Sequence, residues 1–260
     1  MLLVAPLLLL ALATPPTDTL SAPASPSGPT RLDPVAQLVG ALARLPATHP
    51  VRARVDHRVS FTQGEDDPPP AGTVTATAWG GPEGIRIGWS PAVLSRAETE
   101  VRARLADPEA RTPTRDAIGD LRTLAMARAL DAVPELLRDL ADAKLLEDRM
   151  EPLDGVPLRM LRFQVTPVVA ARDRKYVKDI EATARIWLGP DGVPVAEERR
   201  VLLKGRIFLI ITFEIEQKDL FRFGRNGDRL LVLRQESESR SEGASERRDR
   251  HALTTLTLLE

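Results

Sequence analysis

The sequence predicts an α+β domain in which helices cover one face of a large, curved, mainly antiparallel sheet, an unclosed barrel. Three observations lead to this expectation. Apolar and polar residues alternate in segments near both ends of the folded part, helical periodicity fills its middle, and short turns join most predicted strands. Strands joined by short turns pair antiparallel. Strands that are segregated from helices along the chain are typical of α+β folds.

Length, composition and charge bound the class of protein. The chain has 260 residues, of which 43% are hydrophobic and 28% are charged, as in ordinary soluble proteins with a buried core. Its formal net charge is −1 and nothing in it indicates a basic face or stripe, so we expect no nucleic-acid partner. Because the chain has no cysteine, disulfides, thiolate metal sites and cysteine nucleophiles are excluded.

The first 32 residues are interpreted as an export signal and a linker. After Met1 comes an apolar run of 12 residues, shorter than the about 20 that a membrane-spanning helix needs and typical of a signal peptide. Ala11-Leu12-Ala13 supplies the small residues of a cleavage site. We therefore predict a signal peptide over 1–13 and a periplasmic or secreted location. Residues 14–32, rich in Pro, Ser and Thr, are predicted to be a linker, and 33–260 a single α+β domain.

The domain is predicted to open with a helix and a strand. Asp33 is a natural N-cap, Pro34 suits the first helical position, and Pro46 ends the helical periodicity. Residues 51–63 then alternate between apolar and polar, which is typical of a half-buried strand. The apolar face of that strand carries Val55, His57, Val59 and Phe61.

Two more strands and a helical region follow. Residues 64–72 indicate a loop, and residues 73–90 predict two strands around a glycine-rich turn. The second of these strands places Ile85, Ile87 and Trp89 on one face. Apolar residues then recur at helical spacing, which predicts helices over 92–108, 114–130 and 131–146.

From about residue 147 the period returns to two, which predicts a run of antiparallel strands. A hairpin is expected over 184–200, "ARIWLGPDGVPVAEERR", and another at Asn226-Gly227, since Asn-Gly between apolar runs favours a tight turn. Residues 206–217 and 220–223 are predicted to be separate strands. The polar segment 236–250 is predicted to be either two solvated hairpin arms around Gly243 or a loop.

The strand predicted over 206–217, "RIFLIITFEIEQ", raises the question of a cavity. Its apolar residues occupy both faces at one end, and so do those of 220–223 and 229–233, so part of the sheet should be covered on both sides. Helices that cover it tightly give an ordinary core, whereas loosely packed helices leave an apolar cavity that suits an acyl chain. The candidate ligand-binding residues of such a cavity are His57, Trp89, Phe208, Ile210, Phe221 and Phe223.

No constellation in the sequence predicts catalysis, a metal site or a cofactor. The nucleophile elbow, the P-loop, the Rossmann fingerprint and H-E-x-x-H are all missing. The acidic cluster Glu65-Asp66-Asp67 lacks the alternate spacing of a calcium loop. His57 is either a hydrogen-bonded core residue or a polar group in the cavity, and Asp56 points to the other face. We therefore expect that the protein is not an enzyme.

In organisation the chain resembles the periplasmic lipoprotein-carrier superfamily, the LolA- and LolB-like proteins with the related envelope-stress sensor domain RseB. The shared features are the signal peptide, the first amphipathic helix, the early strands, the mid-chain helices and the hairpin 184–200. The resemblance covers residue 33 to about residue 235. It implies an unclosed antiparallel barrel, covered by helices around a hydrophobic cavity.

Two functional hypotheses follow from the resemblance and the cavity question. The first is an exported carrier or binding protein for a hydrophobic ligand such as a lipid acyl chain, with that ligand or a lipidated protein as its partner. The second is an envelope scaffold or stress-sensor-like module with a filled core, which binds another protein. A carrier needs a cavity of about several hundred Å³, whereas a scaffold needs an exposed apolar patch.

Overall fold

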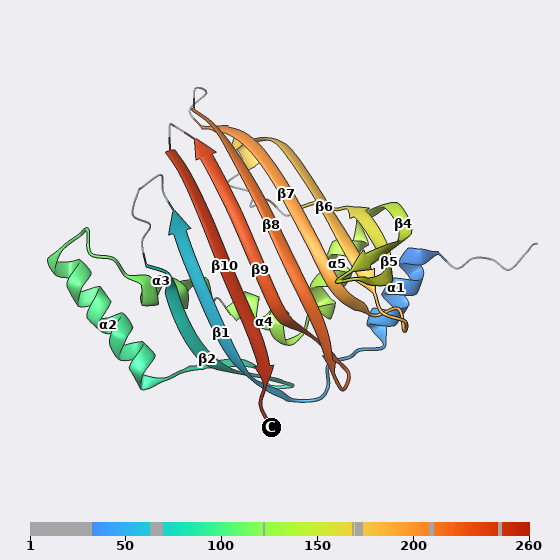
Figure 1. The fold of residues 1–260 in the computed structure, drawn as a ribbon, viewed down its shortest axis with the longest axis horizontal. Helices are drawn as coiled ribbons and strands as arrows, with labels where there is room; N and C mark the ends of the chain where they lie inside the picture. The colour runs from blue at the N-terminus through green and yellow to red at the C-terminus, as the bar shows by residue number, and fades with distance from the viewer. Residues whose placement is uncertain are drawn as a thin grey trace, which may run out of the picture. The chain divides into compact units, whose positions relative to one another are not determined.

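One ten-stranded sheet organises the residues that the structure describes (Figure 1). The computed structural model describes residues 33–62, 70–121, 123–167, 169, 174–207, 211–243 and 246–260. The predicted signal peptide and linker, residues 1–32, lie outside the described residues.

All neighbouring strands of the sheet pair antiparallel, and the sheet does not close. The order across it is β3-β2-β1-β10-β9-β8-β7-β6-β5-β4, so the pairing of β1 with β10 joins the two ends of the folded part. The predicted fold class, α+β with an unclosed curved antiparallel sheet, is confirmed. The strands are β1 (Val51–Thr62), β2 (Gly72–Gly81), β3 (Gly84–Trp89), β4 (Lys144–Leu153), β5 (Val156–Gln164), β6 (Val177–Leu188), β7 (Pro194–Ile207), β8 (Ile211–Asn226), β9 (Arg229–Gly243) and β10 (Glu246–Leu258).

Helices lie against one face of this sheet, except α2 (Pro91–Ala106), which stands apart from it (Figure 1). Asp33 caps the first of them as expected, because its side chain accepts a hydrogen bond from the Val35 amide at 3.0 Å and Pro34 takes the first helical position. The helices are α1 (Pro34–Ala43), α2 (Pro91–Ala106), α3 (Pro113–Asp120), α4 (Thr123–Leu130) and α5 (Val133–Ala141), with a short 3₁₀ turn at Arg174–Tyr176.

The core lies between this face of the sheet and the helices. β1 follows the predicted alternation, since its apolar residues and His57 are turned toward the helices and its arginines toward solvent. The buried helix residues that meet the sheet are Leu38 and Leu42 of α1, Met126 and Leu130 of α4, and Val133, Leu136 and Leu140 of α5. α2, all of whose residues the structure describes, buries none of them and stands apart from the strands (Figure 1).

The prediction of one strand over 206–217 is wrong, because two antiparallel strands occupy the described parts of this segment. β7 ends at Ile207, β8 begins at Ile211, and these two residues pair with each other. The apolar run therefore belongs to two neighbouring strands rather than to the two faces of a single strand. β8 also continues without a break through 220–223, so that segment is not a strand of its own.

Two of the predicted helices are also corrected. The segment 114–130 forms two helices, since Leu121 leaves the helical conformation and turns its side chain into the core. The helix predicted over 131–146 ends at Ala141 because Lys144 already pairs with Gln164 in the sheet. Of the two alternatives for 236–250, the structure shows hairpin arms, with Gly243 of β9 paired to Glu246 of β10.

Candidate functional site

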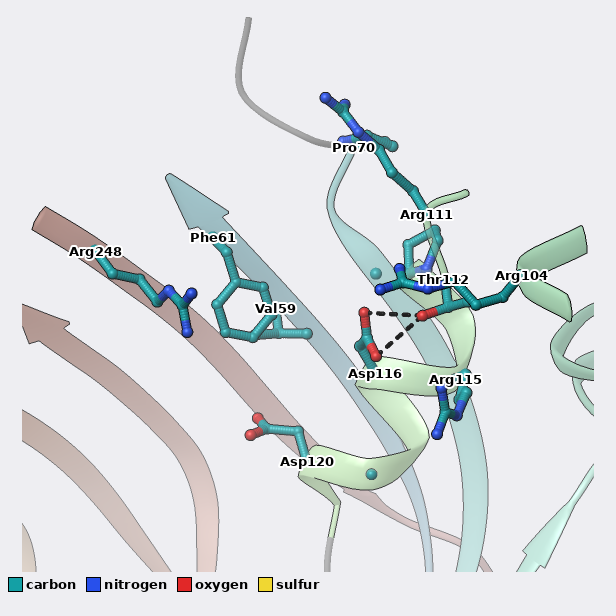
Figure 2. Close-up of a pocket in the computed structure, with 13 residues that line it drawn as sticks. Val59, Phe61, Pro70, Arg104, Arg111, Thr112, Arg115, Asp116, Asp120 and Arg248 are labelled. Carbon is teal, nitrogen blue, oxygen red and sulfur yellow. Dashed lines mark hydrogen bonds between the residues drawn. The ribbon is translucent and has the colours of Figure 1, made fainter. Parts of the chain in front are cut away.

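A cleft of about 800 Å³, here named the arginine cleft, is the first candidate for a functional site. It lies where α2 and α3 approach the ends of β1 and β10 (Figure 2). Its apolar residues are Val59 and Phe61 of β1 together with Pro70 and Pro113. Its charged residues are four arginines and two aspartates, namely Arg104, Arg111, Arg115, Arg248, Asp116 and Asp120.

Two local features fix the wall that α3 gives to the cleft. Gly72 lies so close to the start of α3 that a Cβ atom there would stand 2.1 Å from the Pro113 carbonyl oxygen, and only glycine allows this approach. The Glu100 carboxylate of α2 accepts hydrogen bonds from the Thr114 and Arg115 amides at 3.1 and 3.0 Å. These free amides at the start of a helix attract a carboxylate, so Glu100 holds α2 against α3.

The two sides of the cleft carry different side chains. Phe61 and Arg248 stand on the β1 and β10 side, and Asp116 and Asp120 stand on α3 (Figure 2). Asp116 accepts hydrogen bonds from the Thr112 hydroxyl at 3.2 and 3.3 Å. The arrangement places an apolar surface next to basic groups, which suits a ligand that has an apolar part and an acidic part.

A second hollow of about 220 Å³, here named the His57 cavity, lies between α3, α4 and the sheet. Asp120 lines both this cavity and the arginine cleft. His57 is 3% exposed, and its Nδ1 atom lies 2.9 Å from Oγ1 of Thr254 on β10. Its Nε2 atom lies 3.0 Å from Oδ2 of Asp120 at the end of α3, a short contact that is poorly aligned for a hydrogen bond.

Asp120 is the meeting point of charges in this cavity. Its carboxylate also pairs with the Arg250 guanidinium, whose Nη1 donates to the Ser237 hydroxyl at 3.3 Å. Burial alone would raise the pKa of Asp120, but the close contact with His57 and the charge of Arg250 outweigh it and lower that pKa. The carboxylate is therefore ionised at neutral pH.

A third group of charges, here named the Arg199 network, lies under α4 and α5. It consists of Arg128, Glu135, Asp139, Glu197 and Arg199. Burial would lower the pKa of Arg199, but Glu197 and Asp139 outweigh it and raise that pKa, so the residue stays charged. Burial lowers the pKa of Arg128 more than its carboxylate neighbours raise it. Every charged group of this network contacts a group of opposite sign.

The structure separates the six predicted ligand-binding residues. His57 lines the His57 cavity, whereas Trp89 is half-buried and packs on the core from the edge strand β3. Phe221 and Phe223 are buried, with ring centroids 6.4 Å apart, and Arg128 covers Phe221 at 3.7 Å. Phe208 and Ile210 lie outside the described residues. These residues do not share one described hollow, and a ligand role for them stays a prediction.

Sequence reasoning missed Asp120, Arg250 and Thr254. Alternation along the last strand does place Thr254 and Arg250 on the same face as Leu256, which was the available signal. It does not reveal that Thr254 pairs with His57, because that contact spans 197 residues.

Metal binding, membrane-spanning helices and similarity to known proteins do not narrow the function further. Within the described ranges, no group of His, Cys, Asp and Glu side chains is arranged to hold a metal ion. Nor does any helix in that part of the chain have the length and apolar character to cross a membrane. Comparisons with protein families, curated proteins and solved structures found no match for this chain.

Proposed function

We propose that the protein is an exported carrier or binding protein that holds an acyl chain or a similar hydrophobic group in the arginine cleft. The observation that carries this proposal is the cleft itself. Its volume of about 800 Å³ falls in the range of about 300–1,000 Å³ that small-molecule sites occupy. The sequence resemblance to periplasmic lipoprotein carriers and the predicted signal peptide point the same way.

The lining of the cleft narrows the class of ligand. Phe61 offers a half-buried apolar surface, Val59 beside it is buried, and the four arginines outnumber the two aspartates. Asp120 is already paired with Arg250, which reduces its repulsion of an anion. Arginine forms strong paired hydrogen bonds with carboxylates and phosphates. The ligand that fits is an amphiphile with one acyl chain and an acidic head group.

A fluorescence titration tests this function. The probe is a fatty acid that carries an environment-sensitive fluorophore, compared with its methyl ester. We expect saturable binding of the acid, and binding of the ester that is weaker by about tenfold, the loss of one charge-assisted contact. Phe61→Ser should weaken both probes by about tenfold or more, since it removes a large apolar contact.

The matched control replaces an aromatic residue on the opposite face of the same sheet. Trp79 of β2 lies beneath Arg52 on that face, so Trp79→Ser should leave the affinity for both probes unchanged. If wild type binds neither probe saturably, or if both variants bind as wild type does, the carrier function is wrong.

A second candidate, a protein-binding module, is favoured by α2. Leu94, Val101 and Leu105 lie along one side of this helix, and Leu105 is 82% exposed. An exposed apolar stripe is typical of a surface that binds a partner. In the titration, no binding of either probe would favour this second function over the first.

A further inference from the structure

We infer that the His57 cavity is a site of acyl transfer in which Thr254 is the nucleophile, His57 the general base and Asp120 the residue that orients the imidazole. The substrate class is a carboxylic ester with a short acyl group. This activity goes beyond ligand binding in the arginine cleft and does not depend on it.

The geometry assigns the role of each ring nitrogen. An ionised carboxylate only accepts hydrogen bonds, so the Nε2 atom that lies 3.0 Å from Asp120 carries the proton. Nδ1 then has a free lone pair, which faces the Thr254 hydroxyl at 2.9 Å. A hydroxyl nucleophile thus contacts an imidazole base, and the imidazole contacts an orienting carboxylate. This is the arrangement of a catalytic triad, which is defined by roles and distances rather than by fold.

The surroundings favour this chemistry. His57 is almost fully buried, so its imidazole is held in place by the two contacts and by the packing of α3 on β1. The cavity of about 220 Å³ accommodates a short acyl group, and Asp120 marks the place where it borders the arginine cleft.

The cavity also offers donors for the negative charge that develops on the ester oxygen. The Arg250 guanidinium lines the cavity and points its Nη1 group toward Ser237. The side-chain amide of Gln235 on β9 lines the same cavity. Fixed donors near a developing oxyanion lower the barrier for acyl transfer.

The reaction balances without a co-reactant other than water. The Thr254 oxygen bonds to the carbonyl carbon as its proton moves to His57 Nδ1, and the carbonyl electron pair moves onto oxygen. The tetrahedral intermediate then expels the alcohol, which takes that proton, and leaves an ester on Thr254. Water attacks this ester, gives a proton to His57, and releases the carboxylic acid as the proton returns to Thr254.

The same contacts are compatible with a purely structural role, in which His57 fastens α3 to the sheet. The two roles differ in what they require of Thr254. A fastening role needs only the packing and one hydrogen bond, whereas catalysis makes a covalent bond to Oγ1. A test therefore has to detect that bond.

The experiment measures hydrolysis of p-nitrophenyl acetate and the mass of the intact protein after mixing. We expect turnover and a transient gain of one acetyl group, mapped by peptide analysis to Thr254. Thr254→Val removes the hydroxyl at nearly constant volume and should lower the rate at least about 100-fold, while Thr254→Ser keeps the rate within about tenfold. Asp120→Asn should lower kcat and leave KM unchanged, since it acts through His57.

The control is His251, an exposed histidine three residues from Thr254 on the opposite face of β10. His57→Gln should abolish turnover, and His251→Gln should leave it unchanged. The proposal is overturned if wild type does not hydrolyse the ester, if His57→Gln or Thr254→Val reacts like wild type, or if the acetyl group maps to another residue. Peptide mapping on the wild type decides the question even if a variant does not fold.

Discussion

The Arg199 network and the residues around His57 lie against the same face of the sheet, yet they are built differently. In the Arg199 network every charge contacts at least one opposite charge, and Glu197 is almost fully buried between Arg128 and Arg199. Around His57 the carboxylate of Asp120 contacts both an imidazole and a guanidinium, beside an open cavity whose lining also includes Asp219 and Arg128.

This difference separates charges that hold the fold together from charges that are available for chemistry. Removing one partner of a buried ion pair is costly, because the other charge stays buried without compensation. A buried polar group that faces open space can instead change its partners when a ligand enters. We therefore expect substitutions in the Arg199 network to act on stability, and substitutions around His57 to act on both stability and activity.

The largest effect is expected from Arg199→Met, which keeps the length of the side chain and removes its charge. Glu197, Glu135 and Asp139 then lose a shared partner, and the free energy of unfolding should fall by about 3–5 kcal/mol. Urea denaturation measures this loss.

Arg138 provides the control: it contacts the same Glu135 and Asp139 but is 63% exposed, so Arg138→Met should cost about 1 kcal/mol or less. Equal costs for the two variants would show that the network is no more than a set of surface pairs.

A smaller effect is expected from Asp120→Asn. The variant removes the charged partner of Arg250 and His57, so the free energy of unfolding should fall by about 1.5–3 kcal/mol at neutral pH. Asp116→Asn on the same helix is the control. Asp116 is exposed, and the amide oxygen of asparagine can accept the same hydrogen bond from Thr112, so this variant should lose little stability.

The pH dependence of this effect has a definite sign. The pKa of Asp120 is lowered in the folded state, so its contribution to stability is fully present above the ordinary aspartate pKa of 3.8. That contribution is lost as the pH falls through the lower folded-state pKa. The gap in unfolding free energy between wild type and Asp120→Asn should therefore shrink as the pH falls below 3.8. A gap that does not shrink there would contradict the ion pairs assigned to Asp120.

Alternation and capping patterns in the sequence correctly predicted individual strands and helix starts. Alternation identified β1 and its inward face, and the capping residues Asp33 and Pro34 placed the start of α1. The prediction of one strand over 206–217 failed because the sequence shows no break in hydrophobicity where β7 gives way to β8, so Ile207 and Ile211 look like neighbours on one strand. Periodicity alone does not separate one long strand from two short ones.

The candidate site depends on contacts that no local pattern encodes. His57 was singled out as a polar residue on an apolar face, which is a local signal. Its partners come from the end of α3 and from the last strand, and they meet it only because β1 pairs with β10. The break at Leu121, which brings Asp120 to the end of α3, is likewise set by the packing of that leucine into the core.

The smallest effect in this comparison is expected from Gly72→Ala, which alters the position of α3 and leaves the Arg199 network untouched. The new Cβ atom would stand 2.1 Å from the Pro113 carbonyl oxygen, a backbone atom, so α3 has to move away from β2. The free energy of unfolding should fall by about 1–2 kcal/mol, as for other overpacked sites. Amide hydrogen exchange should quicken in α3 but not in α5.

Gly40→Ala is the control, because its Cβ atom meets nothing within 4 Å in α1, and it should stabilise the protein by up to about 1 kcal/mol. Faster exchange in α5 as well would show that the His57 and Arg199 regions unfold as one unit, and the contrast between them would then be one of chemistry and not of stability.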